Sequence, residues 1–216
     1  MASCPWPAAM PATTTRRRPD PAVIANPFAL ISLADSLAAR LNNAYPAALQ
    51  AAHPCSFQSV GSGGLLADLG AEGAVLSVWP HRVTVNEQLR NVRPAPLPTP
   101  GRRNRPLALD VHLLLSVWSG SAATELVVLA WVMRELHREP VLDASSLSSN
   151  GGWRADEVVQ LVPAEMSVED MMRLWEAIAP SYRISVPYVA RIVTLDVEED
   201  EAAPVLSRRF DYARPL

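Results

Sequence analysis

Asp110 and His112 are the two side chains of this sequence whose types and spacing could do chemistry. They stand two residues apart in the stretch Pro106–Gly120, so in a strand they share one face about 7 Å apart. A carboxylate beside an imidazole can orient the ring for general base catalysis. No nucleophile motif such as GxSxG or HExxH accompanies them. A hydrogen-bonded polar pair at a strand or subunit surface is therefore the favoured interpretation, and catalysis is the alternative.

The other histidines and the cysteines do not build a second site. His81 and His137 stand beside apolar segments, and neither has the spacing of a metal ligand to another candidate. The two cysteines, Cys4 and Cys55, make neither a disulfide framework nor a zinc site. We therefore expect no metal and no cofactor.

The strand that carries Asp110 and His112 is predicted to lie on the core. Every second residue from Leu107 to Val117 is apolar, which is typical of a strand on a core. Its other face is mixed, so we expect partial cover or a partner there. The helix predicted next, Ala122–His137, is apolar on nearly all sides, which indicates cover on more than one side. We predict an inner stripe of Leu126, Leu129, Met133 and Leu136, and a subunit interface of Val128, Trp131 and Val132.

Strands and helices alternate around this unit. A helix is expected after an Asn26 cap, and a capping box of Ser167 and Asp170 starts another that ends near residue 179. Pro80 cannot donate a ladder hydrogen bond, so the strand at 74–85 is expected to lie at an edge or to bend there. Other strands are expected at 56–60, 157–162 and 184–197, and the residues predicted to be buried in the strand at 74–85 are Val75, Val78, Trp79 and Val83. The order predicts an α+β fold, a mixed β-sheet with packed helices.

The length of 216 residues suits one globular domain with extensions at both ends. Residues 1–22 combine prolines with an arginine triplet and have no apolar period, so they are predicted to be disordered. The domain is expected over residues 23–197. Residues 198–216 form a C-terminal extension that opens with the acidic run Glu198–Glu201.

The net charge and the hydropathy of the chain limit the kinds of partner that we expect. A net charge of −3 gives no reason to expect binding to nucleic acid or to acidic membranes. No apolar run reaches the roughly 18 residues needed to span a bilayer, and no signal-peptide pattern follows the N-terminal arginines. We therefore expect a cytoplasmic protein without direct membrane contact.

Four segments in chain order carry a resemblance to a known family. They are RVTVNEQLRN (82–91), RPLALDVHLLLSVW (105–118), REPVL (138–142) and MSVEDMMRLWEAIAPSYRISVPYVARIVTLD (166–196). Together they resemble the cap, or tail-terminator, proteins of bacterial contractile injection systems, which are phage tail-like particles. The resemblance covers residues 26–197, and Pro80 departs from it because the family continues there with hydrophobic and aromatic residues.

The resemblance implies a structural role and no enzyme. Such proteins look like phage tail terminators, which form a hexameric ring that closes the distal end of the inner tube and holds the last layer of the sheath. The partners implied are further copies of the chain, the inner tube protein and the sheath protein. We predict a sheath-binding arm that acts by β-strand addition, made of Val205, Arg208, Phe210 and Tyr212. The alternatives are another adaptor, such as a tube-to-baseplate connector, or an enzyme that uses Asp110 and His112.

Overall fold

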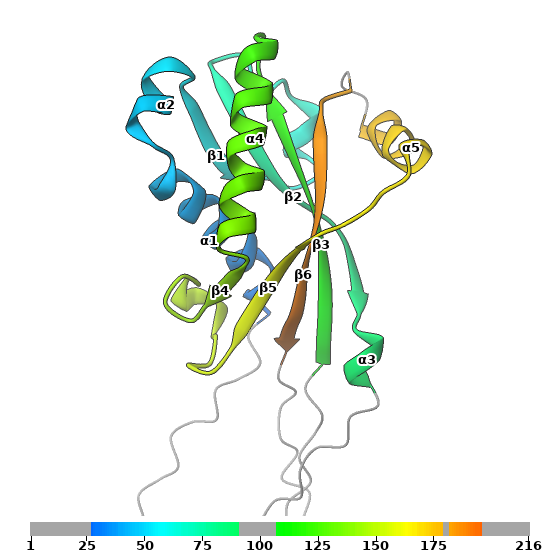
Figure 1. The fold of residues 1–216 in the computed structure, drawn as a ribbon. Helices are drawn as coiled ribbons and strands as arrows, with labels where there is room; N and C mark the ends of the chain where they lie inside the picture. The colour runs from blue at the N-terminus through cyan, green and yellow to red at the C-terminus, as the bar shows by residue number, and fades with distance from the viewer. Residues whose placement is uncertain (1–26, 91–106, 179–181, 196–216) are drawn as a thin grey trace, which may run out of the picture.

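A six-stranded mixed sheet is the frame of the computed structural model, which describes residues 27–90, 107–178 and 182–195 (Figure 1). The strand order is β1-β2-β3-β6-β5-β4. The first two strands of that order are parallel, and every other neighbouring pair is antiparallel. The predicted α+β fold with a mixed sheet is therefore confirmed.

The elements follow the predicted order, with one short edge strand and two short helices, over residues 47–52 and 87–90, that the sequence did not indicate. The strands are β1 (Cys55–Ser59), β2 (Ala74–Val85), β3 (Leu107–Trp118), β4 (Val141–Asp143), β5 (Val158–Pro163) and β6 (Ser185–Leu195). The α-helices are α1 (Ala29–Ala44), α2 (Ala47–Ala52), α3 (Glu87–Arg90), α4 (Ala122–Arg138) and α5 (Val168–Ile178). The unpredicted strand is β4. The N-cap of the predicted capping box is confirmed, because Ser167 Oγ accepts from the Asp170 N–H at 3.0 Å. The Ser167 hydroxyl also donates to the Asp170 carboxylate at 2.7 Å.

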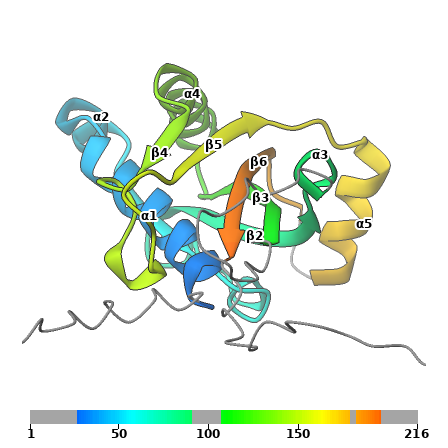
Figure 2. The same cartoon turned by 90° about the horizontal axis from the view of Figure 1, so that it is seen from below.

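The first face of the sheet, under α1 and α4, carries the main core. Figure 2 shows these helices on one side of the central strands and α5 on the other. Alternate residues of β3 from Leu109 to Val117 are buried there, as the period of two predicts. Leucines of α1 at a spacing of four meet them: Leu33, Leu37 and Leu41. The predicted cap Asn26 lies outside the described residues, and Phe28 holds the cap position without a side-chain bond.

The second face of the sheet is covered over only part of its length. We call the covered part the closed half; its buried residues are Leu65, Val75, Trp79, Leu114, Trp118, and Met171, Trp175 and Ile178 from α5. The rest of this face, around Asp110 and His112, is the open half. The expectation of partial cover on this side of β3 is confirmed.

Two β-bulges flank the open half. The register of β2 on β3 shifts between Pro80 and Arg82, and the register of β3 on β6 shifts between Leu109 and Val111. The β1 ladder ends at Val78, so β2 is both bent at Pro80 and without a described neighbour on its outer side beyond that point. The prediction for Pro80 is confirmed.

The first bulge also corrects a burial prediction. Beyond Arg82 the alternation of β2 changes phase, because a bulge inserts one extra residue. Val83 therefore no longer shares a face with Val75 and Trp79, and its side chain is 45% exposed. The prediction that Val83 is buried is wrong.

The predicted inner stripe of α4 is confirmed for two of its four residues, since Leu129 and Leu136 are buried. Leu126 and Met133, predicted to be core, are 58% and 42% exposed. Val128, Trp131 and Val132, predicted to be a subunit interface, are buried within the chain, and Trp131 makes edge contacts with Tyr45 and Phe57 at ring distances of 4.8 and 5.7 Å. That interface prediction is wrong for these three residues. A helix apolar nearly all round has no polar face to fix its rotation.

Candidate functional site

Asp110 and His112 share a face of β3, as predicted, but they bond to different neighbours. The Asp110 carboxylate accepts from Asn86 Nδ2 at 3.0 and 3.1 Å and from the backbone N–H of Ile192 at 3.3 Å. His112 Nε2 lies 3.0 Å from Thr84 Oγ1. Between these two described side chains there is no hydrogen bond. Asp110 therefore does not orient the imidazole, and the pair lacks the geometry of a carboxylate-assisted base.

These groups border a hollow of about 380 Å³ in the open half. Its lining comes from β2, α3, β3 and β6: Arg82, Thr84, Val85, Asn86, Glu87, Gln88, Asp110, His112 and Arg191. Arg82 and Arg191 both stand at the bulges, where extra residues are re-aimed out of the regular alternation. Sequence reasoning missed Arg82, Asn86 and Arg191 because a period of two does not place a side chain beyond a bulge.

Asp110 also fixes the backbone of the second bulge. Ile192 has φ 66°, a left-handed conformation that β-branched residues rarely adopt. Its N–H points to the Asp110 carboxylate. Such strain costs on the order of 1–3 kcal/mol and persists only where neighbours hold it in place. Asp110 is therefore a structural acceptor that shapes the hollow.

The two histidines of the open half are held in the neutral form. The ring centroids of His81 and His112 are 6.1 Å apart. Burial lowers the pKa of His81 to about 4, with further repulsion from His112 and Arg82. Burial and then Arg82 also lower the pKa of His112, against the opposing effect of Asp110. At neutral pH, His112 is therefore a hydrogen-bonding group, and His81 is a packing group whose Nε2 has no hydrogen-bond partner among the described residues.

The described residues give no sign of a metal centre or a membrane span. No group of three His, Cys, Asp or Glu side chains gathers within them as metal ligands. None of the helices described is long and apolar enough to cross a bilayer. Cys55 is buried as a free thiol, and burial raises its pKa to about 11, which disfavours the reactive thiolate.

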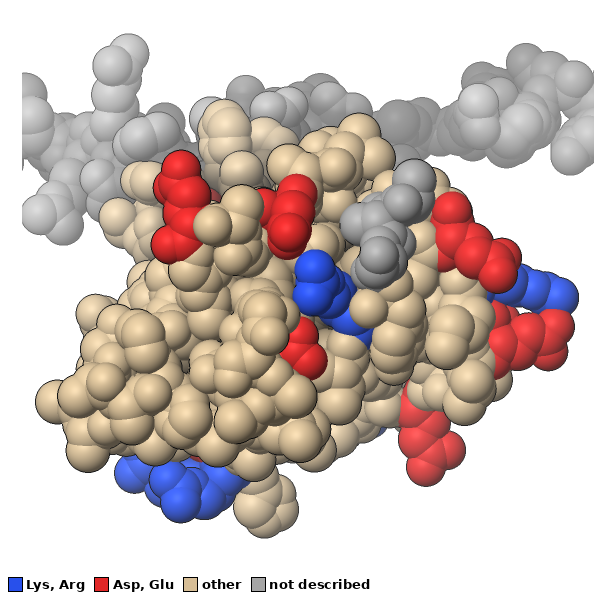
Figure 3. Space-filling view, turned by 90° about the horizontal axis from the view of Figure 1, so that it is seen from above, with Lys and Arg blue, Asp and Glu red and all other residues tan. Residues whose placement is uncertain are grey.

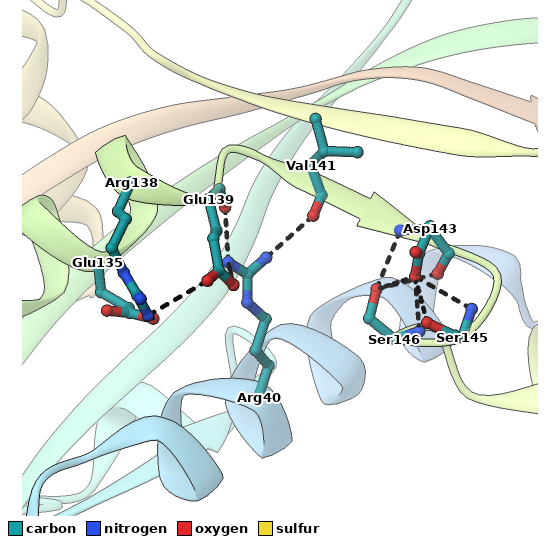
Figure 4. A network of polar contacts seen from close by, with 8 residues as sticks. All are labelled: Arg40, Glu135, Arg138, Glu139, Val141, Asp143, Ser145 and Ser146. Atoms are coloured by element: carbon teal, nitrogen blue, oxygen red, sulfur yellow. Dashed lines mark hydrogen bonds and ion pairs between the residues drawn. The ribbon is translucent and has the colours of Figure 1, made fainter.

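Side chains seal the outer edge of β4. Figure 4 shows Arg40 reaching from α1 to this strand. Its guanidinium donates to the carbonyl oxygens of Val141 at 3.1 Å and Glu139 at 2.6 Å. The neighbouring end of α4 is fixed by Arg138, which pairs with the buried carboxylate of Glu135 at 2.6 Å. An incoming strand would have to displace Arg40 from its acceptors.

An amide seals β1 at the opposite edge of the sheet. Asn42 Nδ2 donates to the Phe57 carbonyl at 2.6 Å, and Asn42 Oδ1 accepts from the Phe57 N–H at 3.1 Å. Both backbone groups of Phe57 are thus paired as a strand would pair them. The described part of β2 from Pro80 to Val85 has no such cover. Among the described residues this stretch is an open strand edge, and Pro80 was its signal in the sequence.

The outward side of α4 is the second uncovered surface. Leu126, Ala130, Met133 and His137 are exposed at spacings of four, three and four, so they form one stripe along the helix. Two large apolar side chains on such a stripe are typical of a surface that meets a partner. We call these four residues the outer stripe of α4.

Comparison with known proteins identifies the kind of fold. Residues 32–208 match the family model described as the Pvc16 N-terminal domain. The structure is similar to the PVC sheath/tube terminator of an extracellular contractile injection system in its extended state, with a TM-score of 0.53 and 18% identity over 87% of this chain and 64% of that chain. The tube-terminating cap of the anti-feeding prophage aligns over 68% of this chain and 52% of that chain, with a TM-score of 0.45 and 17% identity.

This chain therefore spans less than two thirds of the length of both structures. No curated protein matches the sequence. The family match contains all four segments on which the resemblance to cap proteins was based, and it confirms that resemblance.

Proposed function

Because the chain belongs to the Pvc16 N-terminal domain family, we propose that it is a cap that ends the inner tube and anchors the last sheath layer of a contractile injection system. The observation that carries this proposal is the family match over residues 32–208, which includes the whole sheet and every described helix except the first three residues of α1. The fold shared with a sheath/tube terminator supports it. The partners proposed are the inner tube protein and the sheath protein, and the site of assembly is the cytoplasm.

A cap of this kind acts as a closed ring, which we propose to be hexameric. A ring requires a heterologous interface, in which two different surfaces of the chain meet. The outer stripe of α4 supplies one such surface, in place of the buried residues Val128, Trp131 and Val132. The surface seen from above in Figure 3 has large uncharged areas between scattered charged side chains, which also favours protein contacts.

The sheath contact is proposed to come from the C-terminal extension. Its arm residues Val205, Arg208, Phe210 and Tyr212 lie outside the described residues. The described chain stops at Leu195, which pairs with Leu107 at the end of β6. An arm that leaves the sheet at that point would be free to add a strand to a partner's sheet. Deletion of residues 202–216 should abolish sheath binding while the ring remains.

A catalytic role for the Asp110–His112 pair has less support. The two side chains bond to Asn86 and Thr84 and not to each other, and the described residues offer His112 Nδ1 no carboxylate. A tube-to-baseplate connector is a better-supported alternative than an enzyme, because a connector could have the same fold as a cap and differ only in its position in the particle. Gold labelling of a tagged chain in intact particles distinguishes a cap from a connector. A cap should be labelled at the end away from the baseplate, and a connector should be labelled at the baseplate.

A further inference from the structure

We propose that the hollow of the open half is a carboxylate-binding site and that its occupant is the acidic run Glu198–Glu201 of the same chain. The hollow is bordered by Arg82 from β2 and Arg191 from β6. These strands lie on either side of β3, so the two guanidinium groups approach the hollow from opposite sides. The proposal concerns the free chain in solution and goes beyond the role of the chain in a particle.

The two arginines of the hollow have no carboxylate partner among the described residues. The other described guanidinium groups mostly lie within 4 Å of an acidic side chain: Arg40, Arg138, Arg154, Arg173 and Arg183. Among those whose side chains are described, Arg82, Arg134 and Arg191 have no such ion pair. Two of these three border the same hollow, while Arg134 lies on α4.

The carboxylates of the hollow itself leave these two arginines available. Asp110 is occupied by the Asn86 amide and by the Ile192 N–H. Glu87 lies in the first turn of α3 and makes no ion pair with a described residue. Around the arginines, Thr84, Asn86 and Gln88 provide further polar groups. Guanidinium forks with nearby hydroxyl and amide groups are suited to carboxylates.

The acidic run follows β6 closely enough in the chain to reach the hollow. The described chain stops at Leu195, which is four residues and about 13 Å along β6 from Arg191. Arg82 lies at the level of Val189, six residues and about 20 Å from Leu195. Residues 196–201 can span up to about 20 Å when extended, so the run can fold back to Arg191, and its end can reach the level of Arg82. The end of β6, the start of β3 and α3 all lie at the same end of the molecule (Figure 1).

The two faces of the sheet differ in what they offer the run at that end. On the first face, exposed Val83 and Leu107 are apolar. The second face presents Arg82 and Arg191. Desolvation of carboxylates against valine and leucine is costly, whereas pairing with guanidinium is favourable. A tethered ligand also binds at a high effective concentration, so four acidic residues beside two arginines need little intrinsic affinity.

The absence of lysine from the sequence gives a direct test. In full-length R82K the introduced amine is the only side-chain amine. A carbodiimide joins an amine to an adjacent carboxylate as an amide with loss of a urea, so the product records which carboxylate lies beside position 82. R134K is the matched control, since Arg134 is also without an ion pair among described residues but lies on α4. A lysine at position 82 gives a more stringent test than one at position 191, because residue 191 is close to the acidic run in sequence and could be joined to it in any conformation.

Mass spectrometry of the digested products should show R82K joined to one of Glu198–Glu201, and R134K not joined to that run. The yield should fall several-fold in 0.5 M salt, estimated from the shorter screening length. In a mixture of ¹⁴N and ¹⁵N chains, the joined peptides should carry a single isotope. The proposal is overturned if R82K joins only Asp110 or Glu87, if R134K joins the run equally well, or if the joined peptides come from two different copies.

Discussion

The closed and open halves of the second face lie on the same three strands, yet they are built differently. In the closed half, β3 contributes Leu114 and Trp118, which are fully buried under α5. In the open half, the same face of β3 contributes Asp110 and His112, which border a hollow. The change occurs at His81 and Arg82, where β2 bulges and β1 no longer accompanies it.

The difference shows how one strand can serve both stability and recognition. Under α5 the alternate residues are large and apolar, so they gain free energy from removal of surface from water. Beyond the bulge the alternate residues are polar and paired to neighbours across the strands, such as Asp110 with Asn86 and His112 with Thr84. We expect mutations in the closed half to affect unfolding, and mutations in the open half to affect what the surface binds.

Replacement of Trp118 by alanine should have the largest effect on stability. Trp118 is fully buried, its Nε1 donates to Ser77 Oγ at 2.9 Å, and its ring contacts Trp175. Loss of such a side chain typically costs about 3–5 kcal/mol. Urea denaturation should show the loss in W118A. V85A changes an exposed valine that borders the hollow of the open half, and it should stay within about 0.5 kcal/mol of wild type. Equal losses would remove the distinction between the halves.

Replacement of Asp110 by alanine should have an intermediate effect. It removes the acceptor for the Asn86 amide and for the Ile192 N–H, which holds a left-handed residue in place. Because these bonds are partly buried or exposed, we expect the loss of the acceptor to cost about 1 kcal/mol. E87A, an exposed acidic residue of the same hollow, is the control and should have little effect. If the two variants unfold at the same urea concentration, Asp110 does not shape the open half.

His81 at the boundary of the halves should give the chain a pH-dependent loss. Burial lowers its pKa to about 4 in the folded state, against 6.5 for a free histidine. Between those values the unfolded chain binds a proton that the folded chain does not. The contribution of His81 to the free energy of unfolding is therefore complete above pH 6.5 and is lost as the pH falls toward 4. We expect about 1–2 kcal/mol from this group after allowance for its partial exposure.

The measurement for His81 is urea denaturation at pH 7 and pH 4.5. H81Q should show a smaller difference between the two pH values than wild type, because glutamine binds no proton. H137Q changes an exposed histidine on α4 and should retain the wild-type difference. A pH dependence in H81Q that equals that of wild type would rule out the assigned role of His81.

The double variant L126S/M133S should have the smallest effect on stability and a clear effect on assembly. Both side chains are exposed on the outer stripe of α4, so the free energy of unfolding should change by less than about 0.5 kcal/mol per site. If this stripe joins neighbouring copies, native mass spectrometry should show loss of the ring. V168S, which changes an exposed valine on α5, should keep the ring. Rings that form equally well in both variants would exclude the stripe as the interface.

The sequence predicted those features that depend on regular periods and local signals. The alternation of β3 placed its core face correctly, and Ser167 with Asp170 marked the start of α5. The rotation of α4 was not accessible, because Val128 and Met133 are equally apolar and only burial against α1 and the sheet distinguishes them.

The hollow was also beyond the reach of the sequence. Asp110 and His112 were found because their types and spacing are unusual on a strand. The arginines at positions 82 and 191 were not, because a bulge changes the phase of β2 just before Arg82 and a second bulge in β6 includes Arg191 itself. A bulge depends on long-range pairing with β3, which leaves only Pro80 as a local mark.

Electron microscopy of particles from cells that lack this chain tests the proposed cap most directly. If the chain ends the tube and anchors the sheath, the particles should have irregular lengths, contract early or fail to assemble. Restoration of the chain should return a uniform length and add density at the end away from the baseplate. Particles of uniform length with an unchanged far end in the absence of the chain would contradict the cap function.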